Sequence, residues 1–588
     1  MSALFERLVS GLPERHAPAK NSFATDSKSL RIWLAALPLA NPGATARLLI
    51  GALREMNQLR FDPLQRLEAL ELLRPPIDQI VSTLGKQVLG DSFPLPPQKQ
   101  QLGQLAQDFE CEVALGYCSV VYDLCAPAGA VPFLRGKAVA LALTRAIQHR
   151  SAGLYQAYLR YHAPPVGAWQ NLHDLFVFAI AVKADDKPVD DPLYRSAQTS
   201  VRLAYIHALL FALSNPYRFT QKENAEIYTL TRIWAGHCEL RKGRAPAGAI
   251  AIRTDSDQSL GYLPEEREAP DEGLWALEIS GLVRFLEGQL AMLPPGITVT
   301  EFRLRGGPTM HADVAFVERL MRAWDCGTER SQQRLAAGHR LDTLIGLHDL
   351  HYVLAGNLDF DAFLRKTRGV AISLHEGDRV ASWASGSGSG AARVKRLSAK
   401  VRDQSLGGYR LVWEKIDGMR VKVGELLGLA PPALDGEAQD WMIGAIRWLR
   451  IDPSGAMDVG VELLARRAVP VALRNFDAQG VPRAALRGVL LEMLGGDGTD
   501  SATTSIMVPH LFGHEVNEIE LTRPGDPFGW PVEPLVEIRK DLRVSDNGGG
   551  YLRLDLAAEA PTEVGGRPAS AANDDLPPSA NNPALGQH

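Results

Sequence analysis

The apolar residues of this chain change from helix-type to strand-type spacing near residue 370, and this change restricts the fold. Between residues 28 and 240, apolar positions recur every three or four residues, as in LRIWLAAL and SVRLAYIHALLFAL. That is the spacing of amphipathic helices. After residue 370, short β-branched or aromatic runs such as YRLVWEK and MIGAIRWLRI are separated by Gly, Pro and Asp, a pattern typical of small antiparallel barrels. A chain of 588 residues with both patterns is expected to contain several domains.

These patterns predict a multidomain α+β protein with five regions. Between the helical and strand-rich parts the pattern is mixed, and RLDTLIG (340–346) is expected to be a strand leading into a helix. The C-terminal end is rich in Ala, Pro, Asn and Gly and is expected to be disordered. In chain order, the expected regions are a helical scaffold domain (1–240), a mixed α/β segment (241–369), an antiparallel β-barrel (370–467), a β-rich extension (468–558) and a disordered tail (559–588).

Net charge and hydropathy exclude several classes of protein. The net charge of -5 argues against a nucleic-acid coat protein, because a binder of the phosphate backbone normally carries a basic excess. The longest apolar runs, LFVFAIAV and ALLFAL, are shorter than the roughly 20 residues that a membrane span requires. The N-terminus lacks the pattern of a signal peptide. We therefore expect no DNA partner, no membrane span and a cytoplasmic location.

The five cysteines do not predict a metal site or a disulfide framework. Cys111, Cys118 and Cys125 recur every seven residues and would lie on one helix face, where we expect them to be small buried apolar residues. His237 and Cys238 have no paired Cys-x-x-Cys partner, so zinc binding is unsupported. No metal and no cofactor are expected.

A short motif in the strand-rich part carries the functional hypothesis. Residues 403–408 read Asp403-Gln-Ser405-Leu-Gly407-Gly408 and lead into the strand-like segment YRLVW. Three further strand-like segments follow in order: RVKVGELLGL, IRW and GVELL. The motif and this succession of strands resemble the second signature of PilZ domains, which are bacterial receptors for cyclic di-GMP. The resemblance covers residues 370–467 and implies a PilZ-like antiparallel β-barrel that binds the dinucleotide.

The resemblance also implies a role for each residue of the motif. Asp403 and Ser405 would bind a guanine edge and phosphate, while Gly407 and Gly408 would shape the turn. The chemistry is suitable, because a carboxylate accepts charge-assisted hydrogen bonds strongly and residues two apart on an extended segment face the same side. Glycines allow a tight turn and close approach of a ligand.

The arginines that bind phosphate in the family are harder to place in this chain. PilZ receptors normally carry Arg-x-x-x-Arg some twenty to thirty residues before the Asp-x-Ser motif. At that distance the chain reads His375-Glu-Gly-Asp-Arg379, so histidine replaces the first arginine. Arg379, together with Arg402 beside the motif, is expected to neutralise the phosphates and to stack on the bases.

Two alternatives stay open beside the receptor hypothesis. His173-Asp174 and His348-Asp349 resemble the metal-binding doublets of HD phosphohydrolases, although the further ligands that those enzymes need are missing. A long helical array can also act as a protein-interaction scaffold whose PilZ-like barrel no longer binds a ligand. A near copy of the motif at Asp257-Gln-Ser-Leu-Gly261 lacks the strands behind it and is interpreted as a turn.

The sequence therefore predicts a non-enzymatic regulatory protein that responds to cyclic di-GMP. The dinucleotide would bind at the barrel, and the helical region would pass the signal to an unidentified protein partner. The sequence identifies neither that partner nor the process that is regulated.

Overall fold

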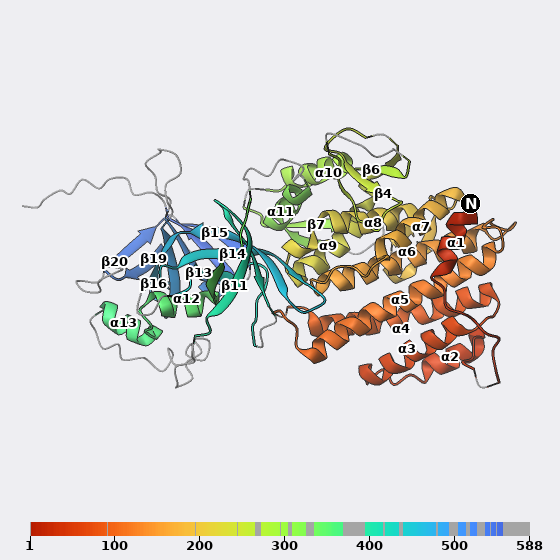
Figure 1. Ribbon diagram of the computed structural model, residues 1–588, viewed down its shortest axis with the longest axis horizontal. Helices are drawn as coiled ribbons and strands as arrows, with labels where there is room; N and C mark the ends of the chain where they lie inside the picture. The colour runs from red at the N-terminus through yellow and green to blue at the C-terminus, as the bar shows by residue number, and fades with distance from the viewer. Residues whose placement is uncertain are drawn as a thin grey trace, which may run out of the picture.

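The computed structural model is elongated, with the helical region at one end and the sheets at the other (Figure 1). This arrangement confirms the predicted multidomain α+β fold. The structure describes residues 2–20, 22–90, 92–194, 196–243, 245–264, 272–294, 296–303, 309–324, 334–368, 394–414, 418–433, 439–477, 480–492, 504–512, 518–525, 535–540, 542–548 and 550–556. The expected tail at 559–588 lies outside the described residues.

The N-terminal region is an array of helices whose apolar faces share one core. The side chain of Asp62 accepts hydrogen bonds from the backbone N–H groups of Leu64 and Gln65, and Thr220 and Glu223 form a capping box. These contacts fix where two of the helices begin. The elements are α1 (Ser2–Ser10), α2 (Ser27–Ala35), α3 (Pro42–Gln58), α4 (Pro63–Val88), α5 (Pro97–Cys125), α6 (Gly136–Leu159), α7 (Ala168–Ala181), β1 (Val189–Asp191), η1 (Pro192–Tyr194), β2 (Ser196–Thr199), α8 (Val201–Leu213), η2 (Pro216–Arg218), α9 (Gln221–Trp234) and η3 (Ala235–His237).

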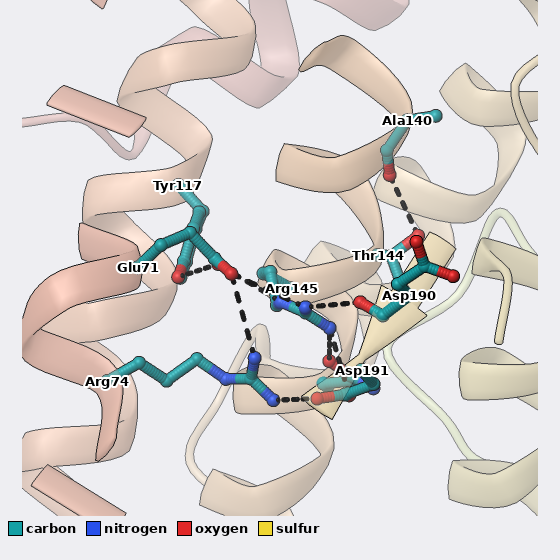
Figure 2. Close-up of polar contacts among 9 residues, drawn as sticks. Glu71, Arg74, Tyr117, Ala140, Thr144, Arg145, Asp190 and Asp191 are labelled. Atoms are coloured by element: carbon teal, nitrogen blue, oxygen red, sulfur yellow. Dashed lines mark hydrogen bonds and ion pairs between the residues drawn. The ribbon is translucent and has the colours of Figure 1, made fainter. Parts of the chain in front are cut away.

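A buried network of charged side chains joins β1 to α4, α5 and α6 (Figure 2). The carboxylate of Asp191 accepts hydrogen bonds from Arg74 Nη2 at 2.6 Å and from Arg145 Nη1 at 2.9 Å. Arg145 also donates to Glu71, which accepts a hydrogen bond from the Tyr117 hydroxyl at 2.6 Å. Burial alone would raise the pKa of Asp191, but the two guanidinium groups outweigh burial and lower it. Asp191 is therefore charged, and it ties the hairpin to the helices.

The middle segment packs on the helical region and shares its core. Strands β3, β6, β4 and β5 form a sheet in that order, and β7 and β8 form a separate hairpin. The indole Nε1 of buried Trp324 donates to Ser214 Oγ at 3.1 Å, which fixes α11 to the end of α8. The elements are β3 (Glu239–Lys242), β4 (Ile250–Arg253), β5 (Gly261–Tyr262), β6 (Leu274–Glu278), α10 (Ser280–Ala291), β7 (Val299–Arg303), β8 (Thr309–Asp313) and α11 (Val314–Trp324).

The next strands form a closed antiparallel barrel in the order β10-β13-β14-β15-β12-β11, in which β10 and β11 pair to close the ring. Burial alternates along β11, since Leu397, Ala399 and Val401 face the core while the residues between them are exposed. The elements are β9 (Leu335–Ala336), β10 (Arg340–Ile345), α12 (Gly346–Leu354), α13 (Phe360–Arg368), β11 (Leu397–Ser405), β12 (Gly408–Trp413), β13 (Leu426–Ala430), β14 (Met442–Ile451) and β15 (Met457–Ala465).

The strand predicted at 340–346 is β10, and it closes the barrel although it precedes residue 370. We therefore propose that the barrel domain be drawn from β9, with α12, α13 and residues 369–393 as an insertion between its first strands. The other expected domain boundaries stay predictions.

The helical region closes one end of the barrel and shares its core. Phe93 and Val421 exchange backbone hydrogen bonds of 2.7 and 2.8 Å, and the N–H of Ile451 donates to the carbonyl of Tyr161 at 2.9 Å. The rings of Phe93 and Tyr161 meet edge to face with centroids 4.7 Å apart, and both residues are 1% exposed. They belong to one apolar cluster with the barrel residue Trp413. The shared apolar core and these backbone hydrogen bonds form the joint that holds the helical region against the barrel.

The strands of the C-terminal unit lie side by side in the same spatial order as those of the barrel, but they follow one another in a different order along the chain. Its strands run β19-β16-β17-β18-β22-β21, which corresponds to β10-β13-β14-β15-β12-β11, and every pair is antiparallel in both units. Among the described residues, β19 pairs with β20 and not with β21, so the unit stays open. The elements are β16 (Arg467–Asn475), β17 (Leu486–Glu492), β18 (Ser505–Pro509), η4 (His510–Phe512), β19 (Glu518–Arg523), β20 (Leu535–Lys540), β21 (Arg543–Gly548) and β22 (Tyr551–Asp555).

Two buried histidines make the stability of the fold dependent on pH. Burial lowers the pKa of His207 and of His351 to about 3, and nearby Arg232 and Arg487 respectively lower it further. Each imidazole is neutral in the folded chain but takes up a proton below about pH 6.5 when unfolded. The free energy of unfolding is therefore unaffected by the titration of these histidines above about pH 6.5. Below that pH it decreases by about 1.4 kcal/mol per pH unit for each histidine, until the pH reaches about 3.

We expect guanidinium unfolding midpoints to decrease from pH 7 to pH 5, and His207→Gln and His351→Gln each to reduce that dependence. Midpoints that do not change over this range would contradict the assignment of neutral buried histidines.

Candidate functional site

The predicted motif forms the hairpin turn between β11 and β12. Ser405 is paired with Gly408 across the turn, and the carbonyl of Gly407 accepts a 2.9 Å hydrogen bond from the N–H of Leu463 on β15. A Cβ atom on Gly408 would overlap the carbonyl oxygen of Val461, so only glycine fits there. The turn is thus held tightly against β15, which explains the second glycine of the motif.

Asp403 is paired with an arginine from the segment just before β9. Strand β9 pairs with β11 and brings Arg334 beside the motif, where its Nη1 donates to Asp403 Oδ1 at 2.5 Å. Arg410 on β12 is more distant, with Nη1 at 3.8 Å from the other carboxylate oxygen. The side chains of Arg334 and Asp403 are 42% and 19% exposed. A pair this exposed contributes only about 0–1 kcal/mol, so a ligand can compete for both groups.

A cleft of about 610 Å³ opens beside the turn and extends to the helical region. A bulge in β14 directs both Arg447 and Trp448 toward it, although neighbours on a regular strand face opposite sides. Trp448 lies directly over Gly460 on the paired strand, where a Cβ atom would overlap the indole. The lining residues are Asn215, Arg218, Arg334, Ser405, Gly407, Gly408, Arg447, Trp448, Gly460, Val461 and Glu462.

The lining groups suit a planar anionic ligand. Trp448 contributes an aromatic ring to the lining, with the Arg410 guanidinium 5.9 Å from its centre, and the guanidinium groups of Arg218, Arg334 and Arg447 supply donors for phosphate. Glu462 is paired with Arg447, and it is the one carboxylate in the described lining. Together with Asp403 at the margin, the cleft can bind phosphates and a base that presents N–H donors.

The structure brings some of the predicted site residues together and separates others. Ser405, Gly407 and Gly408 line the cleft, and Asp403 lies two residues from Ser405 on the same strand. Arg402 is exposed and does not line the cleft, and its carbonyl accepts a hydrogen bond from the N–H of Ala337. Arg379 and His375 lie outside the described residues. The role of Arg379 and Arg402 in binding phosphate stays a prediction.

Arg334 is a candidate that the sequence analysis missed, although a sequence signal for it exists. Residues 330–334 read Arg330-Ser-Gln-Gln-Arg334, which is an Arg-x-x-x-Arg segment. It was missed because Arg334 precedes Asp403 by 69 positions, well beyond the expected twenty to thirty. The insertion that contains α12 and α13 accounts for the extra length. Arg330 itself lies outside the described residues.

The histidines of the phosphohydrolase alternative do not form a metal centre in the described part of the chain. His173 is buried with both ring nitrogens in use, Nδ1 with the Tyr205 hydroxyl at 2.7 Å and Nε2 with the carbonyl of Gln258 at 2.8 Å. His348 is on α12 and contacts its neighbour Asp349. No group of three or more His, Cys, Asp or Glu residues in the described ranges could hold a metal ion.

Two family models match consecutive parts of the chain. The model described as "Cyclic-di-GMP receptor FimW, N-terminal domain" matches residues 28–246, and "Cyclic-di-GMP receptor FimW, middle PilZ domain" matches residues 249–387 and 376–470. The closed barrel and its motif fall within the second match, so this part of the chain is a PilZ-family domain. The first match covers most of the helical array, so the similarity is not confined to the barrel.

One characterised relative resembles the chain over most of its length. The chain is 24% identical over 538 residues to the protein named cyclic-di-GMP receptor FimW from Pseudomonas aeruginosa, covering 85% of this chain and 86% of that protein. No solved structure matches the chain. Within the described ranges, no helix is long and apolar enough to cross a membrane.

Proposed function

We propose that this protein is a cyclic di-GMP receptor that binds the dinucleotide in the cleft beside the β11–β12 turn. The observation that carries the proposal is the juxtaposition of Asp403, Ser405 and Arg334 at the edge of a cleft that also presents Trp448. The relative FimW, itself named a cyclic di-GMP receptor, supports the same ligand.

The ligand would bind by exchanging partners with the existing ion pair. The guanine N–H donors would replace Arg334 on the carboxylate of Asp403, and Arg334 would turn to a phosphate of the ligand. The Ser405 hydroxyl would donate to a phosphate oxygen, and Trp448 would stack on a base. The exchange costs little, because the exposed Arg334–Asp403 pair is worth only about 0–1 kcal/mol.

Binding rather than catalysis is the proposed activity, and the signal would pass to a protein partner through the helical region. Exposed apolar residues support such a partner, since Phe133 and Leu134 between α5 and α6 are 90% and 85% exposed. A cytoplasmic location remains a prediction from the sequence.

Calorimetric titration of the full-length protein tests the proposed ligand. Cyclic di-GMP is expected to bind with a micromolar or lower Kd, and Asp403→Ala to weaken it by about 10-fold or more, because a hydrogen bond to a charged group is worth about 1.5–3 kcal/mol. Ser405→Ala should have a smaller effect in the same direction. Cyclic di-AMP is the control ligand, because the adenine edge lacks the N–H pair that a carboxylate accepts. Absence of heat with cyclic di-GMP, or equal affinity for Asp403→Ala, would reject the site and favour the scaffold alternative.

A further inference from the structure

The cleft has a second wall, which comes from the helical region and not from the barrel. Asn215 and Arg218 stand at the two ends of the short η2 turn, and both line the cleft across from the β11–β12 turn. A neighbouring cavity of about 270 Å³ is also lined by Arg218 and Arg447, so the two cavities adjoin along the joint between barrel and helices. That second cavity contains Arg319 and Arg322 from α11.

The η2 turn is held rigidly from both sides. Asn224 Nδ2 donates to the carbonyl of Pro216 at 2.8 Å, and the Tyr161 hydroxyl donates to the carbonyl of Phe219 at 2.8 Å. On the barrel side, the guanidinium of Arg450 lies 5.5 Å from the centre of the Tyr217 ring. These contacts hold the turn against β14 before any ligand arrives.

The polar side chains of Asn215 and Arg218 are exposed and lie outside the contacts described above that hold the turn. Asn215 has the left-handed backbone φ of +55°, which non-glycine residues rarely adopt and which often marks functional positions. Within the described part of the chain, the side chains of Asn215 and Arg218 have no hydrogen-bond or ion-pair partner. A turn that is fixed by the fold and presents an amide and a guanidinium to a cleft can bind a ligand with little loss of conformational entropy.

We propose that the dinucleotide site is composite, with Arg218 and Asn215 of the helical region contacting the ligand directly. This inference rests on the proposed function and adds the second wall to it. A cyclic dinucleotide carries two phosphodiester groups on opposite sides of its ring, so two facing walls can each contact one of them. Arg334 on the barrel wall binds one phosphate, and Arg218 binds the other, while the Asn215 amide hydrogen-bonds to the ligand beside it. Bound ligand therefore bridges the barrel and the helices, and the helical region senses it by direct contact.

Titration of cyclic di-GMP into the full-length protein tests the second wall. Arg218→Ala is expected to weaken binding by about 10-fold or more, and Arg218→Lys by less, since lysine keeps the charge but loses the planar fork. Asn215→Gly keeps the left-handed backbone and removes only the amide, and it is expected to weaken binding a few-fold. Arg241→Ala is the matched control, because Arg241 is an exposed arginine on β3 outside both cavities.

Hydrogen exchange of the wild-type protein gives an independent measurement. Cyclic di-GMP is expected to slow amide exchange at residues 215–220 as well as in the β11–β12 turn, and Arg218→Ala to remove the first effect. If Asp403→Ala loses binding while Arg218→Ala binds like the wild type, or if protection is confined to the barrel, the composite site is wrong and the barrel site stands. If the wild type does not bind, the proposed function fails, and the composite site fails with it.

Discussion

Replacing Arg334 with alanine is expected to weaken cyclic di-GMP binding by about 100-fold while leaving the fold intact. The substitution removes a guanidinium that binds a phosphate, and a hydrogen bond to a charged group is worth about 1.5–3 kcal/mol. A loss near the upper end of this range amounts to about 100-fold in Kd. Stability should change little, because the exposed pair with Asp403 contributes at most about 1 kcal/mol.

Calorimetry and thermal unfolding of Arg334→Ala, measured side by side, separate these two effects. Arg340→Ala is the matched control, since Arg340 is an exposed arginine on the adjoining strand β10 and does not line the cleft. A loss of affinity in both variants would indicate a general effect of charge and would contradict a specific contact by Arg334.

The same experiment decides between two arginine segments. Arg379→Ala and Arg330→Ala extend the series to the segment predicted from the sequence and to the one that contains Arg334. The position of Arg334 beside Asp403 favours the segment at 330–334. If Arg379→Ala abolishes binding and Arg334→Ala does not, the original interpretation of residues 375–379 is correct.

The fold class could be predicted because periodicity is a local property. Apolar residues recur every three or four positions on the buried face of a helix and every second position on the buried face of a strand. Short stretches of sequence are therefore enough to distinguish the helical part of the molecule from the strand-rich part. Closure of the barrel could not be predicted in this way. Thr343 lies opposite Leu397, 54 positions later, and no local pattern shows that strand 340–345 must cross the insertion to pair there.

The candidate site likewise contains residues that a local motif predicts and residues that only long-range contacts bring to the site. Asp403 and Ser405 were found because they occur within one short motif, whereas Arg334 reaches them through long-range strand pairing. Asn215 and Arg218 belong to no motif at all, and only the joint between the two regions brings them to the cleft.

The near copy at Asp257 shows why the motif alone was insufficient evidence. Its carboxylate accepts hydrogen bonds from the backbone N–H groups of Gly167, Trp169 and Gln170, and so caps the start of α7. An aspartate followed by serine and glycine can therefore serve a helix as readily as a ligand. The strands that follow Asp403 distinguish the motif from its near copy, because they build the barrel wall against which the turn packs.

In the described part of the C-terminal unit, the turn equivalent to the β11–β12 turn is covered, although the unit repeats the strand order of the barrel. The turn between β21 and β22 corresponds to the β11–β12 turn. It packs on the barrel, where the Tyr551 hydroxyl donates to Glu425 Oε1 at 2.5 Å. Glu425 is 7% exposed, and burial raises its pKa, so this contact lies in a buried interface. The position that we propose binds a ligand in the barrel thus serves packing in the second unit.

Asp191→Ala is expected to destabilise the helical region by about 3–5 kcal/mol. The variant leaves the guanidinium groups of Arg74 and Arg145 buried with Glu71 as the remaining carboxylate of the network (Figure 2). Removing one member of a buried charged network has this cost because the charges left behind cannot return to water. Guanidinium unfolding followed by circular dichroism measures the difference.

The pH dependence of the stability that Asp191→Ala loses identifies the cause of that loss. The folded pKa of Asp191 is lowered, so its stabilisation is complete above its unfolded pKa of about 3.9 and is lost as the pH falls through the lower folded value. The gap between wild type and Asp191→Ala should therefore be constant from pH 8 to pH 5 and narrow only below about pH 4. Glu239→Ala breaks a pair in which both side chains are about two-thirds exposed, and it should cost less than about 1 kcal/mol. If the two variants lose similar stability, the buried network does not hold the helices together, and the stability of the helical region must come from apolar packing alone.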